Sequence, residues 1–422
     1  MNFLLMILII ITLLPLYNKN RTVMILGLIL ALNCASNLVP FELGISEGFS
    51  LKNLFYLCLL YFGLLKRNNY DYVKYSYSIE LLWLIFTIFT VISILFNINR
   101  FNLIPVEIII KTIFEPLFVV AIIGYVKINN NDITSALDGI FYSISLMTLL
   151  SIIYYFFEIH VPATDISKNS FRMQGIFGDP NFTGAYLSSI LPVGLLNYYN
   201  KSSKKYINLI LVIILSVGII LTGSRGGIIT LTLSWLFTSM IYLNYEKYNI
   251  KLIIITLLIT LLITTVLYFS ISENFYNKII MRFTSHTNKI DDYTSGRLST
   301  YILGIQSIKN DFFIGKGHLG FVGWHNKIHG YPMGIHNYFL DIFSNYGFIA
   351  FLSLLLVYIK SLIYGWKIKK YEPKIFLILI SLFVVIQNLP YCNPIFFAVI
   401  SVFSYQYYNG LQEENNSESI KK

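Results

Sequence analysis

Residues 251–271 have the sequence KLIIITLLITLLITTVLYFSI, in which one lysine precedes an unbroken run of uncharged residues. A run of this length is enough for an α-helix to cross a hydrocarbon core of roughly 30 Å. Similar runs recur along the chain, which is 56% hydrophobic and 12% charged, with a mean hydropathy of +0.66. The sequence therefore predicts an all-α polytopic membrane protein and excludes a soluble domain.

The apolar runs predict about twelve or thirteen membrane helices. They are expected at about 3–17, 22–40, 50–65, 79–97, 106–126, 137–157, 182–199, 206–222, 226–243, 251–271, 337–360, 374–391 and 394–409. The predicted organisation is thus a first group of helices in 1–271, a long polar loop in 272–335 and further helices in 336–411. A polar tail, 412–422, is expected to be disordered and cytoplasmic.

Lysine and arginine are distributed unevenly between alternate loops. By the positive-inside rule, the loops rich in these residues are cytoplasmic. The net charge of +10 is therefore attributed to membrane topology and not to binding of nucleic acid. The same rule places the long loop 272–335, Arg225 and the loop 158–181 together on the outer face. The basic loops include Lys201, Lys204 and Lys205, and also Lys367, Lys369 and Lys370.

The long loop is expected to contain an amphipathic helix that begins near Arg297 and ends at Asn310 and Asp311. It would lie against the membrane or against the helix bundle. The stretch Gly315–Gly320 that follows is predicted to be a tight turn. It resembles a phosphate-binding loop only superficially, since it lacks the Walker lysine-serine pair and a preceding strand. In the predicted amphipathic helix, the apolar residues at helical spacing are Leu298, Tyr301, Ile302, Ile305 and Ile308.

Two arginines on the outer face are candidates for contact with phosphate, because guanidinium stays charged and binds phosphate bidentately. Arg225 lies within Gly223–Gly227, where small residues let backbone N–H groups approach a ligand at the start of a helix. Arg297 begins the amphipathic helix, where a cation is unfavourable unless an anion compensates. The alternatives are an interfacial arginine that reaches lipid headgroups for Arg225, and a solvated loop charge for Arg297.

His336 opens the helix that returns to the membrane and is the candidate general base. Near two arginines and a helix N-terminus the neutral imidazole is favoured, which is the form that a base needs. The alternative is a histidine that caps the helix or lies at the membrane interface. Asn337, the next residue, is a candidate for binding substrate. Asp341 could support a polar site or pair with a cation.

Three more residues are candidates for binding substrate. Arg172 and Asn181 bound a turn-rich segment on the outer face and could bind sugar hydroxyls or phosphate. The alternative is a structured turn that ends in a helix cap at Asn181. Glu115 follows Glu107 and Lys111 at four-residue spacing on one helical face. These three charges are interpreted either as an ion-pair ladder within the membrane or as a wall of the substrate cavity.

The sequence supports neither a metal site nor a disulfide framework. His325 and His329 have i, i+4 spacing, but the stretch from His318 to His336 contains no Cys, Asp or Glu. Pro332 and neighbouring glycines also interrupt any single helix there. The three cysteines lack CxxC spacing. We therefore expect no metal and no cofactor.

Taken together, these segments resemble the O-antigen ligase/polymerase family of bacterial membrane glycosyltransferases. The resemblance extends from about residue 172 to 356, and the first half of the chain matches only as a run of helices. It is carried by four segments: Arg172–Asn181, Gly223–Gly227, the SGR helix start at Arg297 with its following Phe312–Gly317, and HNYFLDIFSNYGFIAFL from His336.

This resemblance implies a GT-C-like helical fold and metal-independent chemistry on undecaprenyl-diphosphate-linked glycans at the outer face of the bacterial cytoplasmic membrane. The pyrophosphate-binding arginines of the family fall on Arg225 and Arg297, and its essential histidine falls on His336. The expected partners are the lipid-linked glycan and the bilayer, with a chain-length regulator and a flippase as protein partners. No nucleic acid is expected.

The family contains polymerases and ligases, which these motifs do not separate. A composition rich in Ile, Asn, Lys and Tyr, with no obvious added domain, favours an O-antigen or capsular polysaccharide polymerase. An O-antigen ligase of lipopolysaccharide synthesis or a protein O-oligosaccharyltransferase is the first alternative. A polysaccharide or lipid transporter would need access from both faces, whereas the polar motifs gather on the outer one. A lipid-binding scaffold would leave His336 unexplained.

Overall fold

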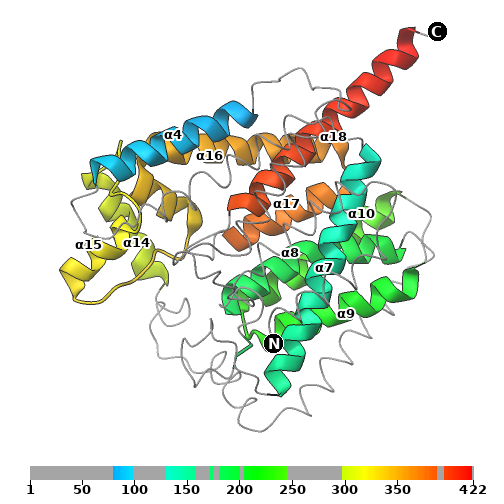
Figure 1. Cartoon of the computed structure of the whole chain (residues 1–422), viewed down its shortest axis with the longest axis horizontal. Coiled ribbons are helices and arrows are strands. Elements are labelled where there is room, and N and C mark those ends of the chain that lie inside the picture. The colour runs from blue at the N-terminus through cyan, green and yellow to red at the C-terminus, as the bar shows by residue number, and fades with distance from the viewer. Residues whose placement is uncertain are drawn as a thin grey trace, which may run out of the picture. The chain divides into compact units, whose positions relative to one another are not determined.

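The computed structural model describes residues 79–97, 130–157, 172–173, 180–199, 204–245, 297–386 and 394–420. Every regular element in these ranges is an α-helix, as Figure 1 shows, which confirms the predicted all-α class. The chain forms two compact units that alternate along the sequence. The first comprises 1–67, 129–285 and 369–385, and the second comprises 68–128, 286–368 and 386–422.

Three described helices are long and apolar enough to cross a membrane by length and composition. They are α4 (Ile79–Phe96), the part Ile133–Phe156 of α7 (Asn130–Phe156), and α16 (Tyr338–Ile368). Shorter apolar stretches lie in α9 (Lys205–Leu221), α10 (Arg225–Tyr245) and α17 (Pro373–Ile386). The protein is polytopic. The spans predicted within 1–78, 98–129 and 246–296 lie outside the described residues, so the number of helices stays a prediction.

In the first unit, α8 (Pro180–Tyr199) is the central helix and packs against α7, α9 and α10. Nearly all of its side chains are buried. Glycines let the neighbours approach closely, as in other helix contacts within membranes. A Cβ on Gly194 would lie 2.3 Å from the Phe141 ring, and a Cβ on Gly227 of α10 would lie 3.0 Å from Cα of Gly184.

A polar cluster ties α17 to α7 in the same unit. Lys374 Nζ lies 2.8 Å from Oδ1 of Asp138, which also accepts a hydrogen bond from Asn197 at 2.8 Å. Thr134 Oγ1 donates to Oε2 of Glu372 at 2.6 Å. Burial raises the pKa of Glu372 above its usual range, while the Lys374 ammonium opposes that shift. The cluster therefore satisfies polar groups that burial would otherwise penalise.

The second unit is built around α16, which packs against α4, α14 (Arg297–Asn310), α15 (Gly320–His329) and α18 (Pro394–Ile420). Figure 1 shows α4 running alongside α16. Trp83 of α4 donates its indole N–H to Oγ of Ser401 of α18 at 3.2 Å. Phe397 of α18 contacts the rings of Trp83 and of Tyr358 in α16. These contacts join three helices into one core.

Several predicted boundaries were wrong. α7 begins at Asn130 and α16 continues to Ile368, each beyond the predicted ends. α18 continues to Ile420, although the tail 412–422 was expected to be disordered. Glutamate and glutamine are good helix formers and no proline interrupts this stretch, so the helix is not forced to end. α15, Gly320–His329, was not predicted, because glycines obscured its periodicity.

Candidate functional site

α16 is broken at Gly347, which has φ 82° and ψ −177°. A Cβ at this position would lie 2.1 Å from the carbonyl oxygen of Phe313. Glycine alone combines a positive φ with so close an approach of another backbone. The apolar pattern of the helix continues through this position and therefore predicts an unbroken helix, which is wrong here.

The turn 311–317, between α14 and α15, pairs with the broken part of α16. A break leaves backbone groups of the helix without their usual partners. The turn satisfies them in both directions, donating two N–H groups to α16 and accepting one. The three bonds run from Lys316 N to Ser344 O (3.1 Å), from Gly317 N to Asn345 O (2.7 Å) and from Phe348 N to Phe312 O (2.9 Å).

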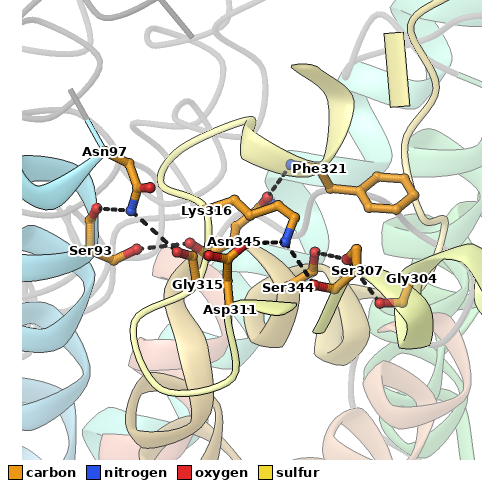
Figure 2. A network of polar contacts seen from close by, with 10 residues as sticks. All are labelled: Ser93, Asn97, Gly304, Ser307, Asp311, Gly315, Lys316, Phe321, Ser344 and Asn345. Carbon is orange, nitrogen blue, oxygen red and sulfur yellow. Dashed lines mark hydrogen bonds and ion pairs between the residues drawn. The ribbon is translucent and has the colours of Figure 1, made fainter. Parts of the chain in front are cut away.

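A buried ion pair fixes this turn, as Figure 2 shows. The Lys316 side chain has an exposed fraction of 0%. Its ammonium donates to Oδ2 of Asp311 at 2.5 Å and to the carbonyl oxygen of Ser307 at 2.7 Å. Ser307 Oγ in turn lies 2.5 Å from Oγ of Ser344. The pair thus links the end of α14 to α16.

α4 and α15 join the same network. Asn97, which directly follows α4, donates from Nδ2 to the carbonyl oxygen of Gly315 at 3.2 Å. Ser93 Oγ donates to the carbonyl oxygen of Asn345 at 2.8 Å, and Phe321 N–H donates to Oδ1 of Asn345 at 2.9 Å. We call this set of bonds around the turn 311–317 and the break in α16 the α16 junction.

α14 is also held against the segment that precedes α16. Tyr301 Oη donates to the carbonyl oxygen of His336 at 3.2 Å, and Thr300 Oγ1 lies 3.4 Å from the carbonyl oxygen of Ile335. One turn further along α14, Gly304 packs on the buried Ile335 side chain. The first turns of α14, which begin with Arg297, are therefore fixed next to His336.

His336 itself has φ 50°, in the left-handed region. Asn337 caps α16, since its Oδ1 accepts the N–H of Leu340 at 3.1 Å and its carbonyl oxygen accepts the N–H of Asp341 at 2.8 Å. The expectation that His336 opens the helix was wrong, because the helix begins at Tyr338 and His336 precedes the cap. The cap uses the side-chain Oδ1 and the main-chain carbonyl oxygen of Asn337. It leaves the side-chain NH₂ group of Asn337 for other contacts.

Tyr301 connects the two candidate residues of this unit. Burial raises the pKa of Tyr301, and the nearby Arg297 guanidinium opposes that shift. Tyr301 is therefore a neighbour of Arg297 and a hydrogen-bond donor to His336. In the sequence, Tyr301 is recognisable only as one member of the apolar face of this helix. Its four-residue spacing from Arg297 was the signal that pointed to a shared surface.

In the first unit, the turn around Arg225 is a compact helix connection. α9 ends at Leu221 and α10 begins at Arg225. Ser224 caps α10, because its Oγ accepts the N–H of Gly227 at 3.2 Å, and Thr222 Oγ1 accepts the N–H of Ser224 at 3.2 Å. Arg225 thus occupies the first turn of a helix, where exposed N–H groups favour anions. Its contact with phosphate stays a prediction.

Arg172 and Asn181 are brought together by the same turn. Arg172 donates from Nε to the carbonyl oxygen of Thr222 at 2.7 Å and from Nη2 to Oδ1 of Asn181 at 3.0 Å. Met173 N–H donates to the carbonyl oxygen of Leu221 at 3.0 Å. α8 begins at Pro180, a residue suited to the first helical position, so the expected cap at Asn181 was wrong. These bonds hold Arg172 against the connection between α9 and α10, and a role of Arg172 and Asn181 in binding substrate stays a prediction.

Residues 210–355 match the O-antigen ligase family. The match confirms the family resemblance, and it contains Arg225, Arg297 and His336. Members of this family are membrane glycosyltransferase-type enzymes. Arg172 and Asn181 precede the matched residues. No curated protein matches the chain.

The matched residues also include most of the histidines. His318 Nδ1 lies 2.7 Å from Oη of Tyr346, and burial lowers the pKa of His318. His325 Nδ1 lies 2.9 Å from the carbonyl oxygen of Tyr331, and its ring centroid lies 4.5 Å from that of His329. Within the described ranges, no group of three or more His, Cys, Asp or Glu side chains is arranged to hold a metal ion.

Glu107, Lys111 and Glu115 precede the family match and lie outside the described residues. Both interpretations of these charges, the ion-pair ladder and the cavity wall, stay predictions.

Proposed function

We propose that the protein is a polysaccharide polymerase. It transfers a glycan from an undecaprenyl-diphosphate donor to a hydroxyl of a second lipid-linked repeat unit, at the outer face of the cytoplasmic membrane. The observation that carries this proposal is the hydrogen bond from Tyr301 to the backbone of His336, next to Arg297, within residues that match the O-antigen ligase family. This bond supports the proposal because it joins the helix that begins at Arg297, the candidate phosphate ligand, to the backbone of His336, the candidate base.

The proposed role of Arg297 is to bind the diphosphate of the donor. Its guanidinium can donate two parallel hydrogen bonds to phosphate oxygens. As the bond between the anomeric carbon and the diphosphate oxygen breaks, negative charge grows on the leaving group. A cation already in place stabilises that charge without rearrangement, which lowers the barrier.

The proposed role of His336 is to accept the proton of the acceptor hydroxyl. The deprotonating oxygen attacks the anomeric carbon from the side opposite the diphosphate, so the product has inverted configuration at that carbon. The undecaprenyl diphosphate leaves with the electron pair of the broken bond. The donor is already activated, so this transfer requires no ATP.

Arg225 is proposed as a second contact for phosphate. Support comes from its place in the first turn of α10, after a capped turn of small residues, and from its position inside the family match.

A ligase is the second candidate, because the matched family is described as O-antigen ligase. A ligase would use the same donor and the same proton transfer, but its acceptor would be a lipid core or a protein. The two enzymes differ in the material that accumulates when they are lost.

The decisive experiment measures glycan size in cells that lack the protein and carry wild type, His336→Ala or His329→Ala. His329 is exposed at the end of α15 and serves as the matched control. A polymerase predicts single repeats in the deletion, and a ladder restored by wild type and by His329→Ala alone. Long polymer retained on the lipid carrier would identify a ligase instead. An unchanged ladder in the deletion would contradict both.

A further inference from the structure

α14 has an inverted distribution of side chains. Thr300 and Ser307 have exposed fractions of 0%, and with Gly304 they form the face that packs on α16 and on Ile335. Three large apolar residues of the same helix point outward, whereas Ile308 is buried. Leu298, Ile302 and Ile305 have exposed fractions of 41%, 50% and 50%.

This distribution is the reverse of that in a helix exposed to water, where apolar residues face the core and polar ones face the solvent. It is typical of helices in contact with lipid, which pack through small residues and expose large apolar ones. From the sequence alone, the apolar face of this helix could meet either the membrane or the bundle. The structure directs it away from α16, the helix on which α14 packs.

The charges of α14 agree with a position among lipid headgroups. Arg297 is its first residue, Lys309 lies in its last turn, and the helix contains no acidic residue. Lys309 is exposed and continues the stripe of Leu298, Ile302 and Ile305 at helical spacing. A lysine at this place can keep its aliphatic part against apolar surface while its ammonium reaches phosphate.

The apolar surface continues from α14 toward a membrane span. Phe312 and Phe313, which follow α14, are exposed by 41% and 69%. The Phe312 ring stacks on Phe348 of α16 with centroids 5.2 Å apart. Further along α16, Leu352 and Leu356 begin an exposed apolar stripe on the longest candidate span. The two surfaces are therefore connected through the aromatic residues of the α16 junction.

We propose that α14 is a membrane-surface helix whose exposed apolar stripe inserts into the acyl region of the adjacent bilayer leaflet. Arg297 and Lys309 then lie at the depth of the phosphate groups. The inference rests on the proposed function only in identifying this leaflet as the outer one. Its consequence is that the lipid surface, and not a protein partner, sets the height of Arg297.

The test uses the full chain with its three cysteines replaced, reconstituted in nanodiscs of phosphatidylethanolamine and phosphatidylglycerol. Spin labels are attached at Ile302→Cys and, as an independent variant, at Ile305→Cys. Leu356→Cys on α16 is the lipid-facing control, and Lys327→Cys, exposed on α15, is the water-facing control. The measurement is the accessibility of each label to oxygen, which partitions into lipid, and to a polar nickel chelate, which does not.

We expect the ratio of oxygen to nickel accessibility at 302 and 305 to exceed that at 327 severalfold and to stay below that at 356, which lies deeper in the hydrocarbon core. A ratio equal to that at 327 would overturn the proposal, because the helix would then face water. Low accessibility to both reagents would also overturn it, since another part of the chain or a second copy would cover the stripe. Both readouts are independent of glycan synthesis, so they are unaffected if the proposed function fails.

Discussion

Each of the two units contains an arginine that the sequence predicts to bind substrate, and the structure gives these arginines different surroundings. In the first unit, Arg172 is itself the connector, since its guanidinium joins the carbonyl oxygen of Thr222 to Asn181. In the second unit, the connection beside Arg297 is made by its neighbours Thr300 and Tyr301. Residue type and predicted membrane face are the same for both arginines, so their hydrogen bonds in the structure are the reason to expect different roles.

The largest expected effect on stability concerns Lys316. Its side chain links parts of the second unit by hydrogen bonds, as the side chain of Arg172 does in the first unit. Lys316→Met should lower the free energy of unfolding by about 3 kcal/mol, because it leaves a partly buried Asp311 carboxylate without its cation. Thermal unfolding of the purified protein checks this. Lys309→Met, at an exposed position of α14, is the control and should have no measurable effect. Equal stability of the two variants would mean that the ion pair does not hold the α16 junction.

Arg297→Ala should reduce transfer of glycan by about 10²–10³-fold, the loss typical of removing one group that stabilises developing charge. The amount and thermal stability of the protein should stay close to wild type. The measurement is the rate of polymer formation from purified lipid-linked repeat units in vesicles. Full activity at normal protein levels would show that the phosphate assignment of Arg297 is wrong.

Arg172→Ala should act mainly on stability, lowering the free energy of unfolding by about 1–3 kcal/mol, because the Thr222 carbonyl oxygen and the Asn181 amide lose their partner. The rate per folded molecule should change much less than in Arg297→Ala. Thermal unfolding and specific activity are measured on the same preparation. A stable protein with greatly reduced activity would contradict this prediction and would indicate that Arg172 binds substrate.

The smallest expected effect is that of Tyr301→Phe, which removes one hydroxyl and keeps the ring. Loss of its hydrogen bond should cost about 1 kcal/mol of stability. If Tyr301 positions His336, kcat should fall several-fold while KM stays near the wild-type value. Thr300→Val, which removes the longer of the two bonds to this segment, is the matched comparison. A change in KM alone would instead indicate contact with substrate.

The sequence predicted the positions of those helices that are marked by a single apolar run or a single helix face. The runs at 182–199 and 206–222 correspond to α8 and α9 within two residues at each end. The helix near Arg297 was also predicted, and it begins and ends as expected. These features depend on residues within a few turns of one another, so local pattern is sufficient to predict them.

The α16 junction could not be predicted in this way. Lys316 and Asn345 are far apart in sequence, and the buried pair with Asp311 gives no periodic signal. The glycine at 347 looked like one small residue in an apolar helix, which a continuous helix tolerates. Only the approach of Phe313 reveals why the helix breaks there.

The break at Gly347 also divides α16 into two segments, which differ in how their length compares with the thickness of the hydrocarbon core. Its 31 residues would make a rod of roughly 46 Å at about 1.5 Å per residue, longer than a hydrocarbon core of about 30 Å. The part after Gly347 alone measures roughly 31 Å by the same rise. The part after Gly347 therefore matches the thickness of the hydrocarbon core. The nine-residue part nearest His336 is not needed to cross that core. Shortening the later part would create hydrophobic mismatch, whereas shortening the earlier part would change the height of His336 above the lipid.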